Sequence, residues 1–152
     1  MAGVVSFESR SPEETRVLGE RLGRCLQPGD VVLLSGELGA GKTVFVQGIA
    51  RGAGYEGAVS SKSFVLLGEY PGRVKLYHAD LYRLETPEQV EELALDEVCA
   101  GGALVVEWPE RARLWWEQHL LVCFEVTGED TRTLSLDGHG PRGNHLLARM
   151  KG

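Results

Sequence analysis

The segment 31–43 reads Val31-Val32-Leu33-Leu34-Ser35-Gly36-Glu37-Leu38-Gly39-Ala40-Gly41-Lys42-Thr43. Its first four residues form a continuous apolar run, which is typical of a strand buried on both faces of a parallel sheet. Residues 36–43 match GxxxxGK[ST], the phosphate-binding P-loop pattern. The residues from 43 to 53 are predicted to form a helix. Because a buried strand precedes the pattern and a helix follows it, the sequence predicts a phosphate site here.

Each residue type of this motif has a physical reason. Glycines let backbone N–H groups turn toward phosphate oxygens where side chains would block them. Lys42 supplies a positive charge for the β- and γ-phosphates, and Thr43 offers a hydroxyl to Mg²⁺. The helix that follows points its positive end at the same phosphates. The simpler alternative, a glycine-rich turn with a surface lysine, does not account for the strand and helix around the motif. The predicted nucleotide-binding residues of the loop are Gly36, Glu37, Leu38, Gly39, Ala40, Gly41, Lys42 and Thr43.

Two acids stand at predicted strand ends. Asp80 ends the predicted strand 74–80, and Glu107 follows the apolar run 103–106. A P-loop protein needs an acid that holds Mg²⁺ or orients water, usually at the end of a buried strand. The residues alone do not divide these roles between the two acids. The single asparagine, Asn144, excludes the Asn-Lys-x-Asp guanine reader, so ATP and ADP are the expected nucleotides.

The rest of the chain alternates between predicted strands and helices. Strands are expected over 4–7, 64–70, 74–80, 103–106, 120–126 and 133–136, and further helices begin after Ser11 and Thr86. Pro71 and Gly72 join 64–70 and 74–80 as a hairpin. This order predicts a P-loop NTPase-like α/β three-layer sandwich, with a mainly parallel sheet, helices on both faces and an antiparallel hairpin insertion. Residues 1–137 are expected to form the domain, and residues 138–152, which contain no acid, a basic, frayed tail.

The composition of the chain argues against several classes of function. The chain has 152 residues and a net charge of −6, which argues against a broad nucleic-acid surface. No apolar run approaches the roughly 20 residues of a membrane span, and no signal peptide is expected. The three separated cysteines fit a reducing, cytoplasmic environment without a disulfide frame or zinc site. The acidic stretch 85–97 is interpreted as a solvated helix face, with a docking surface for a basic partner as the alternative.

From about residue 11 to 136 the chain resembles the bacterial TsaE (YjeE) family, small P-loop ATPases that serve biosynthesis of the tRNA modification threonylcarbamoyladenosine. The resemblance rests on the P-loop and on three further blocks: Tyr77-His78-Ala79-Asp80-Leu81-Tyr82-Arg83-Leu84, Glu91-Glu92-Leu93 and Glu107-Trp108-Pro109-Glu110. The first and last of these blocks are much more specific than the P-loop itself.

The resemblance implies roles for individual residues. Gly39 to Thr43 would bind the phosphates, Thr43 and Glu107 would hold Mg²⁺, and Asp80 would act in hydrolysis. Thr15 matches a family position near the nucleotide and Arg132 a less certain one, although Thr15 is equally well explained as an ordinary helix residue. Trp108 belongs either to the core or to the functional surface, and His78 is interpreted as a packed or surface histidine.

One loop departs from the family pattern. The family has Ser-Pro-Thr-Phe or Ser-Pro-Thr-Tyr in a switch-like loop, and this chain has Ser61-Lys62-Ser63-Phe64. Without the proline the backbone is less restrained. Ser61 and Ser63 are therefore the candidate residues of a looser switch loop.

The function expected from this resemblance is that of a Mg²⁺-dependent ATPase with Lys42, Asp80 and Glu107 as catalytic residues. Its partners would be the TsaD and TsaB proteins, and tRNA would be reached only through their complex, with no membrane involved. Turnover alone is expected to be slow, because only Arg83 is a candidate arginine finger in cis. The alternatives are a small-molecule kinase, which needs an acceptor pocket and an arginine-bearing lid, and a nucleotide-gated adaptor whose hydrolysis is incidental.

Overall fold

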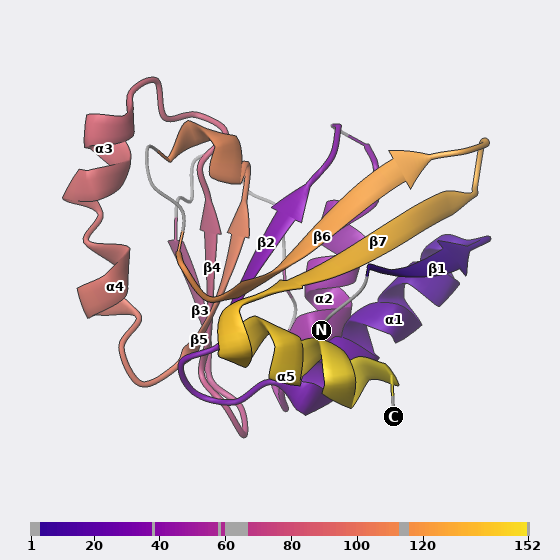
Figure 1. The fold of residues 1–152 in the computed structure, drawn as a ribbon, viewed down its shortest axis with the longest axis horizontal. Helices are drawn as coiled ribbons and strands as arrows, with labels where there is room; N and C mark the ends of the chain where they lie inside the picture. Colours follow the sequence, from indigo (N-terminus) through magenta and orange to yellow (C-terminus); the bar gives the residue numbers. More distant parts are fainter. Residues whose placement is uncertain (1–3, 38, 58, 60–66, 113–115, 152) are drawn as a thin grey trace.

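The computed structural model describes residues 4–37, 39–57, 59, 67–112 and 116–151 (Figure 1). A seven-stranded sheet runs in the order β1-β7-β6-β2-β5-β4-β3. The strands are β1 (Val5–Ser9), β2 (Val31–Ser35), β3 (Leu67–Tyr70), β4 (Leu76–Asp80), β5 (Ala103–Glu107), β6 (His119–Val126) and β7 (Arg132–His139). The helices are α1 (Pro12–Cys25), α2 (Lys42–Gly52), α3 (Pro87–Glu92), α4 (Leu95–Val98) and α5 (Gly140–Lys151), with a 3-10 turn η1 (Pro109–Arg111). Within the described ranges, no helix combines the length and apolar character needed to cross a membrane.

The centre of the sheet is parallel and its outer parts are antiparallel. β2 pairs in parallel with β5 and β6, and β4 pairs in parallel with β5. β3 pairs antiparallel with β4, which confirms the predicted hairpin. β6–β7 and β7–β1 are also antiparallel, so the expected mainly parallel sheet is only partly matched. The turn between β6 and β7 is closed by the Thr127 N–H donating to the Thr131 carbonyl at 3.0 Å, and so short a connection allows only antiparallel pairing.

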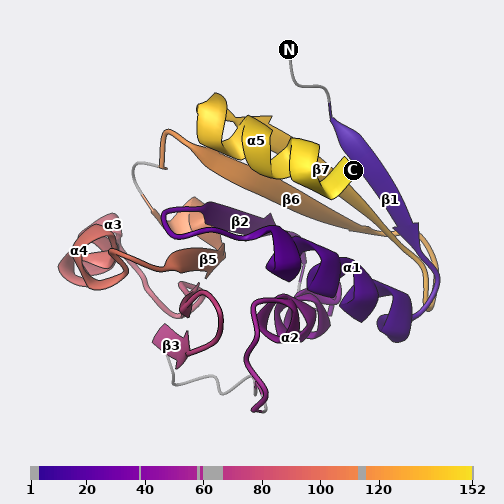
Figure 2. The ribbon, with the colours of Figure 1, turned by 90° about the horizontal axis from the view of Figure 1, so that it is seen from below.

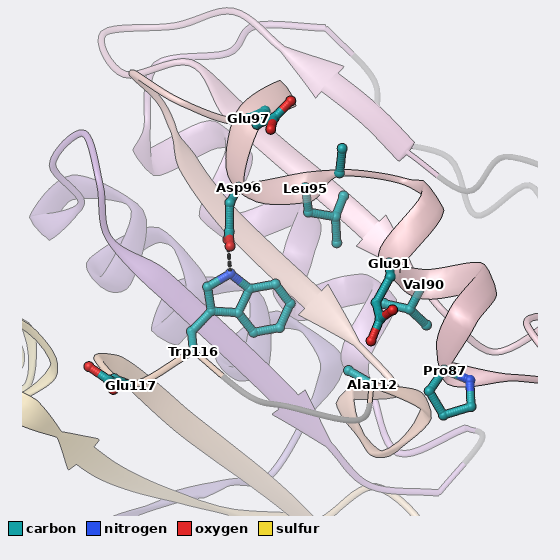
Figure 3. A pocket seen from close by; sticks show the side chains of 10 residues that line it. Pro87, Val90, Glu91, Leu95, Asp96, Glu97, Ala112, Trp116 and Glu117 are labelled. Carbon is teal, nitrogen blue, oxygen red and sulfur yellow. Dashed lines mark hydrogen bonds between the residues drawn. The ribbon is translucent and has the colours of Figure 1, made fainter.

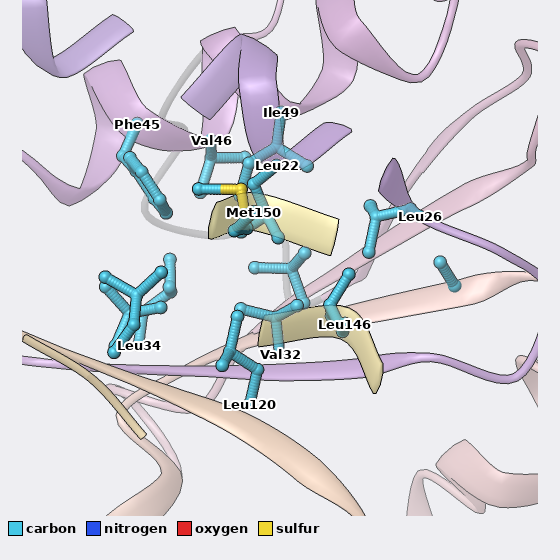
Figure 4. Close-up of a cluster of buried hydrophobic side chains, with 14 of the residues drawn as sticks. Leu22, Leu26, Val32, Leu34, Phe45, Val46, Ile49, Leu120, Leu146 and Met150 are labelled. Atoms are coloured by element: carbon cyan, nitrogen blue, oxygen red, sulfur yellow. The ribbon is translucent and has the colours of Figure 1, made fainter. Parts of the chain in front are cut away.

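Helices cover both faces of the sheet, as the sequence predicts. α1, α2 and α5 share one apolar core, in which Leu22, Phe45 and Leu146 pack with Val32 and Leu34 of β2 (Figure 4). On the other face, residues of α3 and α4 pack with β4 and β5 (Figure 2). The arrangement has three layers, and the apolar run of β2 is buried because both outer layers contact it.

α1 and α2 cross with their backbones in contact, because glycines line the crossing. A Cβ built at Gly48 would lie 2.1 Å from the Arg16 carbonyl oxygen, and one built at Gly23 would lie 2.1 Å from the Ile49 carbonyl oxygen. Neither position can hold a methyl group unless the helices move apart. The crossing therefore fixes α1 relative to α2, the helix that begins at Lys42.

Residues 140–151 form helix α5, which differs from the expected frayed tail. Leu146, Leu147 and Met150 are buried in the core shared with α1 and α2. Arg149 donates to the Asp30 carboxylate at 3.0 Å, and the Asp30 side chain is only 2% exposed. The expected domain boundary at residue 137 lies inside β7. Residues 140–151 form a packed helix in spite of their basic composition, because their apolar residues have helical spacing and a buried acid pairs with Arg149.

Candidate functional site

The P-loop motif joins the end of β2 to the start of α2, as predicted. Gly36, Gly39 and Gly41 have backbone φ angles of 151°, 79° and 100°, in the region that side chains rarely adopt. Gly41 is the N-cap of α2, which leaves the first N–H groups of this eleven-residue helix without partners in the preceding turn. Glu37 is exposed and Ala40 is buried, while Leu38 lies outside the described residues. Such a loop is able to receive an anion at the helix N-terminus.

Lys42 folds into the loop. Its side chain is nearly buried, and Nζ donates to the Gly36 carbonyl oxygen at 2.6 Å. Nζ also lies 4.0 Å from the centre of the Trp108 ring. Burial lowers the pKa of the Lys42 ammonium, and the negative charges of Glu107, Glu110 and Asp80 oppose this shift. The lysine thus lies among carboxylates that come from the ends of β4 and β5 and from η1.

Asp80 and Glu107 are neighbours at the carboxyl ends of adjacent parallel strands. They are register partners between β4 and β5, and Glu107 is also the register partner of Leu34 in β2. The Asp80 carboxylate accepts a hydrogen bond from the Tyr82 N–H at 3.0 Å. Burial raises the pKa of Asp80; the Tyr82 N–H acts in the opposite direction, and the charge of Glu107 adds to the rise. The structure therefore brings Lys42, Asp80 and Glu107 together.

His78 contacts Glu107 directly, which the sequence interpretation missed. Its Nε2 lies 2.6 Å from Oε2 of Glu107, and the two side chains are 13% and 9% exposed. The available signal was position: His78 stands two residues before Asp80, so both side chains leave β4 on the same face. The partner of His78 is 29 residues away in the chain, and only the register of β4 with β5 identifies it.

Trp108 combines core packing with contact to the site. Its backbone lies in the left-handed region, with φ 58°, and Pro109 begins η1 directly after it. The ring packs on Tyr82, with ring centres 4.9 Å apart, and on the Lys42 ammonium. The residue also borders the core beneath α3 and α4. Both readings of Trp108 left open by the sequence describe part of its environment.

Thr15 and Arg132 both lie beside the loop. Thr15 is buried, its hydroxyl is 2.6 Å from the Ser9 hydroxyl, and its methyl group lies 3.8 Å from a Cβ built at Gly41. Arg132 donates from Nε to the Ala40 carbonyl at 3.2 Å and from Nη2 to the Gly39 carbonyl at 3.3 Å. Its Nη1 donates to carbonyls of the β6–β7 turn.

The remaining predicted residues are Thr43, Arg83, Ser61 and Ser63. Thr43 is half-buried in the first turn of α2, and Arg83 is exposed. Ser61 and Ser63 lie outside the described residues, so the switch-loop prediction stays a prediction.

The donor atoms at this edge suit a hard cation. Among the described residues, no group of three or more His, Cys, Asp or Glu side chains is arranged to hold a metal by itself. Mg²⁺ does not need such a group, because it is usually bound through one or two carboxylates together with substrate phosphates and water. The Glu107 carboxylate and the Thr43 hydroxyl are ligands of the required type, and both lie on segments that border the loop.

A groove of about 690 Å³ lies between α3 and α4 on one side and Ala112, Trp116 and Glu117 on the other (Figure 3). Its lining combines apolar Val90 and Leu95 with acids of the stretch 85–97. Asp96 accepts a hydrogen bond from the Trp116 indole N–H at 2.7 Å. All acids of the stretch 85–97 are exposed, which agrees with the solvated helix face expected from the sequence, and three of them also line this groove.

The sheet order and the glycine-rich turn between β2 and α2 define a P-loop-like α/β protein. Residues 9–134 match the family model described as threonylcarbamoyl adenosine biosynthesis protein TsaE. The chain belongs to the TsaE family.

Individual relatives agree with this family. The chain is 39% identical over 152 residues to the tRNA threonylcarbamoyladenosine biosynthesis protein TsaE of Bacillus subtilis, covering 96% of the chain and 93% of that protein. It is 45% identical over 104 residues to the protein of the same name from Treponema pallidum, covering 68% and 77%. The crystal structure of Bacillus subtilis YdiB superposes with a TM-score of 0.79 at 30% identity, covering 99% of this chain and 96% of that one.

Proposed function

We propose that this protein is a Mg²⁺-dependent ATPase required for threonylcarbamoyladenosine modification of tRNA. The observation that carries the proposal is the meeting of Lys42, Asp80 and Glu107 at one edge of the sheet, beside the glycine turn that starts α2. Membership of the TsaE family supports the pathway. The chemistry of the site supports the binding of a nucleotide.

The loop binds the phosphates of ATP or ADP. N–H groups at the start of α2 and the Lys42 ammonium receive the phosphate oxygens, and Lys42 exchanges its bond with the Gly36 carbonyl for them. Thr43 and Glu107 hold Mg²⁺. The ion, when bound, neutralises charge on the phosphates.

Asp80 orients and deprotonates the attacking water. Its raised pKa, which results first from burial, makes its carboxylate a stronger base than an exposed aspartate. Arg83, the candidate finger in cis, is exposed. Turnover of the protein alone is therefore slow, and a partner supplies the missing stabilisation of the transition state.

The partners are the TsaD and TsaB proteins. ATP binding promotes association with this threonylcarbamoyl transferase pair, and hydrolysis resets the complex for another cycle. The protein works in the cytoplasm and reaches tRNA through the complex, since a chain with net charge −6 is a poor direct ligand for a polyanion.

The test is ATP hydrolysis by the purified protein, first alone and then with the TsaD–TsaB pair. A slow basal rate that rises on addition of the pair and vanishes in Lys42→Ala supports a partner-coupled ATPase. A fast basal rate indifferent to the pair contradicts it and favours a self-contained enzyme such as a kinase. An Asp80→Asn variant that binds ATP and the pair and still supports modification would favour the adaptor.

A further inference from the structure

One short polar contact at the site, outside the P-loop, joins His78 and Glu107. Nε2 of the imidazole and Oε2 of the carboxylate are 2.6 Å apart. An ionised carboxylate only accepts hydrogen bonds, so Nε2 is the donor. Both side chains are nearly buried, and a bond to a charged group in such surroundings is stronger than one in water.

The backbone prepares this contact. β4 and β5 run in parallel with His78 opposite Val105 and Asp80 opposite Glu107, so the imidazole reaches diagonally to the carboxylate two residues further along β5. The strands fix both Cα positions, but a glutamate side chain keeps three rotatable bonds. Burial alone does not select one orientation of the carboxylate. The hydrogen bond from His78 does.

We infer that His78 is a positioning residue that fixes the Glu107 carboxylate through Oε2 and leaves its other oxygen for the cation. This inference rests on the proposed function, because it gives Glu107 the role of Mg²⁺ ligand. In this role His78 acts through Glu107 and is itself neither a nucleotide contact nor a cation ligand. Partners that orient metal-ligating side chains typically change metal affinity about 10- to 100-fold when they are removed.

The experiment measures ADP binding by calorimetry in EDTA and across a series of Mg²⁺ concentrations. His78→Phe keeps a ring but removes the donor, and His78→Gln keeps an N–H near the position of Nε2. The matched control is His139→Phe, which removes another histidine–carboxylate pair, that of His139 with Asp137 at 3.1 Å on β7.

In His78→Phe, the Mg²⁺ concentration for half-maximal effect is expected to rise about 10- to 100-fold, while ADP affinity in EDTA stays as in the wild type. His78→Gln recovers part of the difference, and His139→Phe matches the wild type. If His78→Phe does not fold by circular dichroism, His78→Asn, whose amide is too short to span the gap, is measured against the same criterion.

The outcomes separate this inference from the proposed function. Wild-type protein that binds no ADP, or binds it without any effect of Mg²⁺, overturns the proposed function and the inference with it. Wild-type protein with a Mg²⁺ effect that His78→Phe or His78→Asn retains unchanged overturns the inference alone. A loss of ADP affinity in EDTA as large as the loss in Mg²⁺ also overturns it, because that pattern reports a general structural defect.

Discussion

Substitution of Arg132 tests how the P-loop is held. The guanidinium group of Arg132 lies between the β6–β7 turn and the loop, with donors to Gly39 and Ala40 on one side and to the turn carbonyls on the other. Arg132→Ala removes the charge and the bridge together. Arg132→Lys keeps the charge, but a single ammonium cannot reproduce the planar fork of donors.

The size of the effect follows from the bonds to the loop. The two bonds to loop carbonyls are 3.2 and 3.3 Å long, at and slightly beyond the upper end of the usual N–H···O range. Each contributes about 1 kcal/mol net, so loss of both costs the loop about 2 kcal/mol of its ordering energy. If the loop of the variant becomes ordered only when ADP binds, this energy of about 2 kcal/mol is subtracted from the binding free energy. The dissociation constant for ADP then rises about 30-fold.

The assay is calorimetric titration of ADP, and the control is Arg142→Ala. Arg142 pairs with Asp30, which lies just before the first residue of β2, whereas the P-loop follows the last residue of this strand. We expect Arg132→Lys to lose nearly as much affinity as Arg132→Ala, and Arg142→Ala to keep wild-type affinity. Wild-type affinity in Arg132→Lys would refute this reasoning, since the charge rather than the bridge would then act on the nucleotide.

For three further substitutions the structure determines the direction of the change in stability. Because burial raises the pKa of Asp80, the folded state binds more protons than the unfolded state in the window between the two pKa values, and stability falls as pH rises through it. Asp80→Asn should therefore raise the thermal midpoint at pH 7.5 while it abolishes hydrolysis; a lower midpoint would contradict the burial argument. Gly48→Ala places a methyl group 2.1 Å from the Arg16 carbonyl and should cost about 1–2 kcal/mol in urea unfolding, as overpacking exceeds the gain in helix propensity; an unchanged midpoint would mean that the crossing opens freely. Asp30→Ala removes the buried carboxylate that accepts from Arg149 and from the Gln27 N–H and also pairs with Arg142, and it should cost about 2 kcal/mol in the same assay, whereas a loss below about 0.5 kcal/mol would show that α5 does not depend on these contacts.

The local order of elements was predictable because each signal is short-range. The apolar run of β2, the glycine motif and the helix after it follow one another directly, and capping by Ser11 and Thr86 marks the starts of α1 and α3. The antiparallel pairing of β1, β7 and β6 at the other side of the sheet was not predictable in the same way. Alternating apolar residues in β6 and β7 define strands, but strand order depends on which neighbours pair.

The sequence predicts those site residues that belong to one local motif, but not the contacts between residues of distant segments. Asp80 and Glu107 were found because each ends a recognisable strand. The bond between His78 and Glu107 exists because β4 and β5 pair in one register, and no pattern within either segment encodes it. The bridge from Arg132 to the loop joins residues that lie 92 positions apart in the chain. Helix α5 was not predicted because its basic composition favours a frayed tail, whereas Leu146, Leu147 and Met150 are buried at helical spacing in the core.

The central claim is that the glycine turn and Lys42 form a nucleotide site. The most direct measurement is calorimetric binding of ADP, in the presence of Mg²⁺, to the wild-type protein and to Lys42→Ala, with circular dichroism to show that both are folded. The account predicts one site per chain in the wild type and at least a 100-fold loss of affinity in Lys42→Ala, equivalent to about 2.7 kcal/mol. Equal affinity of the two proteins, or no binding by the wild type, would contradict it.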